Sequence, residues 1–178
     1  MRRILINGLI IVIFLITYFL QSNFFSWFTI AGIMPNLFVV LVLILGLFAG
    51  KIYGTIYGIV FGFLLDLFIG NSVGLTSLML GIIGLAGGFF SKNFSKDSKL
   101  MIMLMVIAST VVYETGIYIF NVIFKSIELE LLSFINILAV EMGYNGVLTI
   151  ILYPMLRVFG EYIESELKMK KIVGIRYF

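Results

Sequence analysis

The chain has 178 residues, of which 62% are hydrophobic and 12% are charged, and its mean hydropathy is +1.19. A soluble domain of this composition would expose far too much apolar surface, so the composition predicts a polytopic membrane protein. There are no cysteines and no histidines, which excludes disulfides, thiol catalysis and the usual zinc sites. No polar stretch is long enough to form a second domain, so residues 1–178 are expected to form a single membrane domain.

Six apolar runs follow one another and predict an all-α integral membrane bundle of six transmembrane helices. The first run lacks the small-residue cleavage site of a signal peptide, so it is expected to be retained. Pro35 and Asn36 mark a helix start, but a helix from Leu37 would be short for a crossing, so the second span is expected to begin near Ile30. The predicted spans are residues 4–20, 30–50, 52–69, 75–90, 100–124 and 134–159, followed by a basic cytoplasmic tail over residues 160–178.

Basic residues are distributed unequally between the loops that six spans create. One side receives the N-terminal arginines, Lys51, the lysines of residues 91–99 and the basic residues of the tail, whereas the other side receives only Lys125. This asymmetry predicts that both termini are cytoplasmic. The tail is expected either to lie as an amphipathic helix at anionic headgroups or to act as a docking motif.

Glycine recurs at every fourth residue across the second and third spans. On a helix this spacing leaves a strip without side chains, where another backbone can approach closely. Packing among the protein's own spans is one explanation, and docking of a partner helix is the other. The candidate helix-packing or partner face is Gly46, Gly50, Gly54, Gly58 and Gly62.

Three acids lie within or near the spans, where an ionisable group is costly and marks a site or a buried network. Polar residues recur at four-residue spacing along the fifth and sixth spans, so their polar faces are expected to meet inside the bundle. Interhelical hydrogen bonding explains this pattern, and a proton or cation path is the alternative. The candidate buried polar network is Asp66, Glu114, Glu141 and Asn145.

Motifs of catalysis are missing from the sequence. It contains no phosphate-binding glycine loop followed by lysine, no HExxH zinc motif and no nucleophile paired with a base. The sequence therefore predicts a protein that is not an enzyme and that uses no cofactor or metal.

The stretch from Pro35 to Gly74 resembles a known family. It opens a span with Pro35, Asn36 and Leu37, continues through the regularly spaced glycines, here called the glycine ladder, and ends with Asp66, Gly70 and Gly74. Within a small six-span chain these residues resemble the rod shape-determining protein MreD family. The resemblance implies a non-catalytic membrane scaffold of the bacterial elongasome, which helps to maintain cell shape and peptidoglycan synthesis. It implies helix–helix contacts with an MreC-like bitopic partner. MreB, RodA and a class B penicillin-binding protein are further implied partners. The chain is expected to contact the lipid bilayer and to bind no nucleic acid.

A second class of protein is similar in architecture. The substrate-binding components of energy-coupling-factor vitamin transporters are also small six-span chains, and the alternative function is such a component. Those proteins present an AxxxA face on the first span to their coupling partner, whereas residues 4–20 contain no alanine. Recovery of an MreC-like protein or of a coupling ATPase with this chain would distinguish the two functions.

Overall fold

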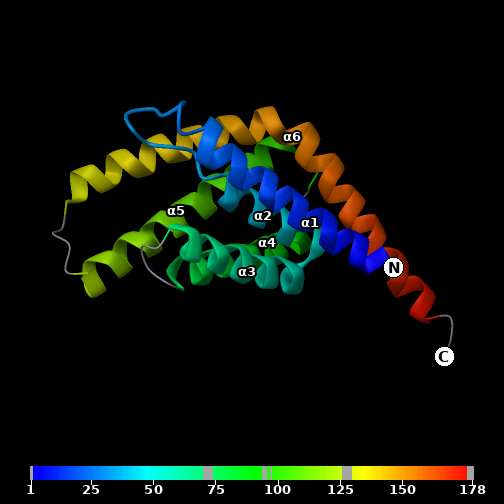
Figure 1. The fold of residues 1–178 in the computed structure, drawn as a ribbon. Coiled ribbons are helices and arrows are strands. Elements are labelled where there is room, and N and C mark those ends of the chain that lie inside the picture. The colour runs from blue at the N-terminus through cyan, green and yellow to red at the C-terminus, as the bar shows by residue number, and fades with distance from the viewer. Residues whose placement is uncertain (1, 70–73, 94–95, 97, 126–129, 176–178) are drawn as a thin grey trace.

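The structure is a computed structural model that describes residues 2–69, 74–93, 96, 98–125 and 130–175. Over these residues the chain is helical apart from its connections and an isolated bridge between Ile30 and Ile33. Both termini lie at one end of the molecule, whereas the end of α5 and the start of α6 lie at the opposite end (Figure 1). The helices are α1 (Arg2–Phe19), a π-helical segment η1 (Leu20–Phe24), α2 (Leu37–Ala49), α3 (Lys51–Ile69), α4 (Leu75–Asn93), α5 (Lys99–Lys125) and α6 (Leu131–Ile175).

The central helix of the bundle is α2. Every residue from Leu37 to Phe48 is buried, and the helix carries no polar side chain. A helix that is apolar on all sides needs neighbours on all sides. These are α3, α4, α5 and α6, which all contact it, and α1, whose Phe14 ring lies 5.5 Å from that of Phe38. The other helices are therefore arranged around α2.

The start of α2 corrects the predicted second span, because residues 30–50 begin too early. The helix starts at Leu37, where the Asn36 side chain accepts a hydrogen bond from the Val39 N–H at 3.3 Å. The Leu37 N–H donates to Oε1 of Gln21 at 2.9 Å. These side chains satisfy backbone groups that a helix N-terminus leaves without partners. The residues before Leu37 therefore form a loop rather than a further helical turn.

Among the described residues, four helical segments are long and apolar enough to cross a membrane, which fits a multi-pass membrane protein. The first continues past the predicted residues 4–20 to Phe24, through η1. The predicted spans 52–69, 75–90 and 100–124 correspond to α3, α4 and α5, but α2 and α4 are shorter apolar helices. The four candidate spans are Ile4–Phe24, Lys51–Phe68, Lys99–Phe124 and Leu131–Leu167.

The last helix, α6, is 45 residues long and extends beyond both limits of the predicted span 134–159. The predicted tail is not separate, because the helix continues to Ile175. Gly160 and Ile163 are buried in this continuation, and Gly160 lies directly against the Phe48 ring at the end of α2. Burial of these residues explains why the helix does not stop at residue 160.

Pro154 lies inside α6, which bends over the bundle (Figure 1). A proline in a helix interior removes one backbone hydrogen bond and crowds the preceding turn, which is a usual cause of such a bend. The bend brings the second part of α6 back onto the end of the bundle that holds both termini (Figure 1).

Charged groups gather where this second part of α6 meets the bundle. Lys96 Nζ lies 3.0 Å from Glu164 Oε1 and 5.1 Å from the centroid of the Phe48 ring. Lys51 Nζ lies 5.9 Å from the centroid of the Phe89 ring. Lysines from two separate connections thus lie at the same end of the bundle, together with the charged part of α6.

Candidate functional site

Three glycines of α3 lie in the contact between α3 and α4. A Cβ atom at Gly58 would overlap the carbonyl of Leu80, and one at Gly62 would overlap the backbone of Ser77. At Gly54 it would be 2.5 Å from the carbonyl oxygen of Gly84, closer than real Cβ contacts. The backbones of the two helices are therefore packed as closely as glycine allows.

The two remaining glycines of the ladder differ from each other. Gly46 lies in the contact between α2 and α4, because a Cβ there would overlap the carbonyl oxygen of Gly84. Gly50 does not belong to it: it lies between α2 and α3 at a φ of 92°, and a Cβ there would meet nothing within 4 Å. Gly50 instead supplies a left-handed turn that folds α3 back onto α2. The regular spacing in the sequence thus covers two helices and the turn between them.

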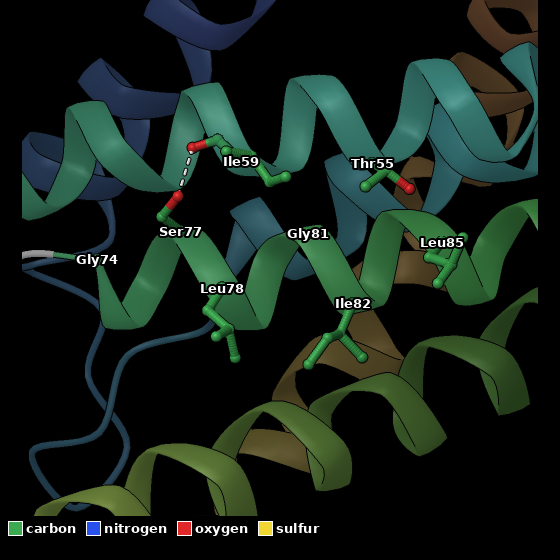
Figure 2. Close-up of a pocket in the computed structure, with 8 residues that line it drawn as sticks. All are labelled: Thr55, Ile59, Gly74, Ser77, Leu78, Gly81, Ile82 and Leu85. Carbon is green, nitrogen blue, oxygen red and sulfur yellow. Dashed lines mark hydrogen bonds between the residues drawn. The ribbon is translucent and has the colours of Figure 1, made fainter.

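An open apolar groove of about 380 Å³ runs along α4 beside this contact (Figure 2). Leu78 and Ile82 project from α4 on the side away from α3, and both are exposed. The hydroxyl of Ser77 donates to the carbonyl oxygen of Ile59 at 2.8 Å, so this polar group is satisfied within the protein. The groove is lined by Thr55, Ile59, Gly74, Ser77, Leu78, Gly81, Ile82 and Leu85.

Asp66, near the end of α3, caps the beginning of α4. Its Oδ2 accepts the N–H groups of Gly74 at 2.8 Å and of Ser77 at 3.2 Å, and its Oδ1 accepts that of Thr76 at 3.3 Å. A carboxyl group is well suited to the N–H groups that a helix N-terminus leaves without partners. Gly74 has a φ of 97°, which favours glycine. Two residues of the family motif therefore contact each other, whereas Gly70 lies outside the described residues.

Glu114 of α5 and Glu141 of α6 meet inside the bundle, where their side chains form a hydrogen bond. Asn145, one turn further along α6, donates to Oε1 of Glu141 at 3.4 Å and to Oγ1 of Thr110 at 2.9 Å. Glu141 is 4% exposed and Asn145 is fully buried. Two carboxyl groups can hydrogen-bond to each other only when one of them carries a proton.

Further polar side chains connect this pair to the rest of the bundle. The backbone N–H of Asn36 donates to Oδ1 of Asn145 at 2.8 Å. The hydroxyl of Tyr113 forms hydrogen bonds with the side chains of Asn36 and Thr76. Asp66 joins only indirectly, through the backbone of Thr76. The polar network therefore holds α2, α4, α5 and α6 together at the start of α2, away from Lys51 and Lys96.

Contacts between the two polar faces stop beyond the glutamate pair. Tyr118 Oη and Asn121 Oδ1, the next polar groups on this face of α5, are buried and have no hydrogen-bond partner among the described residues. The antiparallel register of α5 and α6 continues into apolar side chains, Ile137 and Phe134. The Tyr118 ring accordingly stacks on that of Phe134, with centroids 4.3 Å apart.

Sequence reasoning missed three residues of this arrangement: Gln21, Thr76 and Tyr113. Gln21 is the first polar residue after an apolar run, and Thr76 lies at a helix start, where hydroxyl groups are common. These positions gave a signal, although a weak one. Tyr113 gave none, because nothing in its spacing separates it from the chain's other tyrosines.

The family model described as rod shape-determining protein MreD matches residues 1–163. Neither the curated proteins nor the solved structures include a match to the chain. The family match confirms the resemblance seen in the sequence and gives the transporter-component alternative no support. Proteins of this family determine cell shape and are not known as enzymes. Since the match extends from α1 into the last part of α6, this multi-pass membrane chain belongs to the MreD family of rod shape-determining proteins.

Proposed function

We propose that this chain is a non-catalytic membrane scaffold of the bacterial cell-elongation machinery, which helps to maintain cell shape and peptidoglycan synthesis. The observation that carries the proposal is the family match over residues 1–163. The polar network is consistent with a scaffold, because its groups cap helix starts or bind one another across helices. Their role in this proposal is to hold the bundle in one shape.

All six helices cross the bacterial cell (inner or cytoplasmic) membrane in this proposal, and both termini are cytoplasmic. Two observations support it. First, α2 is about 20 Å long, shorter than a hydrocarbon core of about 30 Å. Non-helical backbone within the core is tolerated where other parts of the protein accept its hydrogen bonds, as Asn145 and Gln21 do for the N–H groups of Asn36 and Leu37. Lys51 and Lys96 lie at the end of the bundle that holds the termini, in agreement with the positive-inside pattern.

The groove on α4 is the surface that we assign to the single transmembrane helix of an MreC-like partner. Association of helices in lipid depends on close packing, and a thin apolar surface permits it. Gly81 and Ser77 keep the groove shallow on the α4 side, while Leu78 and Ile82 offer exposed apolar contacts (Figure 2). MreB, RodA and a class B penicillin-binding protein are then reached through the complex with that partner.

A substitution at the groove tests this assignment. Leu78 is 58% exposed, so Leu78→Trp adds bulk to the groove without entering the contact between α3 and α4. We expect the variant to remain monodisperse, to recover less of the MreC-like partner and to lose rod shape in a complementation assay. The matched control is Ile151→Trp on α6, at a residue that is 63% exposed and lies outside the groove. Full partner recovery with Leu78→Trp would remove the groove from the proposal.

The scaffold function itself has a separate test. The unaltered chain should restore rod shape to a rod-shaped bacterium that lacks its own MreD-family protein. Failure of the inserted, stable chain to do so would contradict the proposed function, whatever the groove variants show.

A further inference from the structure

The loop between α1 and α2, residues 25–36, presents apolar side chains away from the protein. No charged residue lies between Arg3 and Lys51, so this loop has no charge of its own or close to it in the sequence. In water such a surface would be unfavourable. The exposed side chains are Trp27 (88% exposed), Phe28 (55%), Ile30 (53%) and Met34 (42%).

The loop has a defined conformation. The Ile30 N–H donates to the Ile33 carbonyl oxygen at 3.0 Å, and the Ile33 N–H donates back to Ile30 at 2.9 Å. Between them Ala31 and Gly32 have φ values of 53° and 79°. A two-residue connection with both residues at positive φ is the tight turn of a β-hairpin. The exposed side chains are therefore carried on a folded turn.

The backbone of the loop is fastened to α6. The hydroxyl of Tyr144 donates to the carbonyl oxygen of Phe28, and the ring of Phe25 meets that of Tyr144 edge to face, with centroids 6.3 Å apart. The last residue of the loop, Asn36, donates its backbone N–H to Asn145. Because the attachments are on the inner side, the apolar side chains are held outward.

The position of the loop identifies what these side chains contact. The candidate span Ile4–Phe24 has 21 residues, long enough to cross a hydrocarbon core of about 30 Å, and a span that crosses the core leaves the loop at its boundary. Exposed side chains of the span's end, Phe19 and Phe24, continue directly into the loop. Tryptophan and other aromatic side chains favour this boundary, whereas a protein-docking surface usually carries a polar and charged rim.

We propose that the loop of residues 25–36 is an interfacial anchor whose binding partner is phospholipid. Trp27 and Ile30 insert among the headgroups and upper acyl chains of the nearer leaflet, and the insertion does not depend on lipid charge. Through Asn36 and Tyr144, the anchor fixes the depth of the α2 start and of the polar network in the membrane.

Trp27 is the only tryptophan of the chain, so tryptophan emission, excited at a wavelength that the nine tyrosines do not absorb, reports on this loop alone. The full chain is reconstituted into phosphatidylcholine vesicles that contain lipids brominated either near the headgroup end or near the terminal end of the acyl chain. We expect the shallow bromines to reduce the fluorescence more than the deep ones, and aqueous acrylamide to reduce it only weakly. Adding phosphatidylglycerol should leave this pattern unchanged.

A double variant, Trp27→Phe with Ile151→Trp, is the matched control because residue 151 lies midway along the span Leu131–Leu167. Its fluorescence should be reduced more by the deep bromines. Strong quenching of Trp27 by acrylamide with no effect of either bromine would overturn the proposal and place the loop in water, free for a protein partner. Stronger quenching by the deep bromines, or quenching only with phosphatidylglycerol, would also overturn it.

Discussion

The hydrogen bond between Glu114 and Glu141 joins two acids, so it forms only while one of them keeps a proton. A glutamine can serve as the protonated partner, and we therefore expect Glu141→Gln to remain as stable as the unaltered protein. Glu141→Leu removes the partner of Glu114 and one hydrogen-bond acceptor of Asn145, and should lower the free energy of unfolding by about 1–3 kcal/mol. Thermal unfolding of the purified variants in one detergent measures this difference.

The same pair of substitutions at Glu114 provides the internal comparison. Stability that falls as far with glutamine as with leucine, at either position, would show that the bundle needs a negative charge there. In that case the polar network would be a charged site rather than a set of hydrogen bonds.

Asp66 should respond differently, because both of its carboxyl oxygens accept backbone N–H groups of the α4 start. An asparagine offers one acceptor and places an NH₂ group against a remaining N–H donor. We expect Asp66→Asn to lower the free energy of unfolding by about 1–3 kcal/mol, whereas Glu114→Gln leaves it nearly unchanged. Equal stability of the asparagine variant and the unaltered protein would contradict the capping role.

At the scale of helices, the contact between α3 and α4 depends on the lack of side chains. A Cβ at Gly58 would overlap the Leu80 carbonyl, so Gly58→Ala should force the helices apart and lower the free energy of unfolding by about 1–3 kcal/mol. A leucine at Gly54, Gly58 or Gly62 should reduce the monodisperse fraction on size exclusion further. Partner recovery is measured in the same preparations.

Gly143→Ala is the control, because a Cβ at this position of α6 would meet nothing within 4 Å. It should cause no loss of stability, since alanine favours a helix over glycine by about 1 kcal/mol. Should Gly58→Ala behave like Gly143→Ala, close backbone packing between α3 and α4 would be refuted. If the leucine variants fold normally but no longer recover the partner, the face formed by Gly54, Gly58 and Gly62 is the docking surface instead.

The long helices could be predicted from the sequence because charged residues bound their apolar runs. Lys99 and Lys125, for example, begin and end α5. Pro35 and Asn36 mark the start of α2 in the sequence, but the shortness of a helix from Leu37 favours an earlier start. The sequence does not show that Gln21 and Asn145, from other parts of the chain, satisfy the backbone groups at this start.

Polar side chains that recur at four-residue spacing, Glu114 on α5 and Glu141 and Asn145 on α6, lie on facing sides of the two helices. The same kind of spacing was misleading at Gly50, because a period in the sequence does not show where one helix ends and the next begins. Only the backbone angle, with a φ of 92°, separates the turn glycine from its neighbours on the helices. Asp66 was grouped with the other acids for its chemistry, but its partners are backbone groups of α4.

For the whole molecule, the question is whether α2 crosses the membrane. The chain has no cysteine, so single cysteines can be labelled cleanly. Ser26, Ile52 and Ser98 are exposed and lie before α2, after it and before α5. With six crossings, a cysteine at position 26 is labelled from outside intact cells, whereas cysteines at 52 and 98 are labelled only after the cells are permeabilised. The sites Ser95 and Ser126, which the sequence suggests for this test, lie outside the described residues.

A cysteine at position 52 that is labelled together with the one at 26 would show that α2 does not cross. The bundle would then have four crossings, in line with the four long helices. Labelling of positions 26 and 98 from the same side would contradict both arrangements.

The proline in α6 has a mechanical consequence. Because Pro154 has no N–H, the carbonyl group of Ile150 lacks its usual helical partner, and the helix is softer there than on either side. One arm of α6 is tied to the polar network through Asn145, and the other is tied to Lys96 through Glu164. The two attachments of α6 therefore lie on opposite sides of the turn that lacks a backbone hydrogen bond.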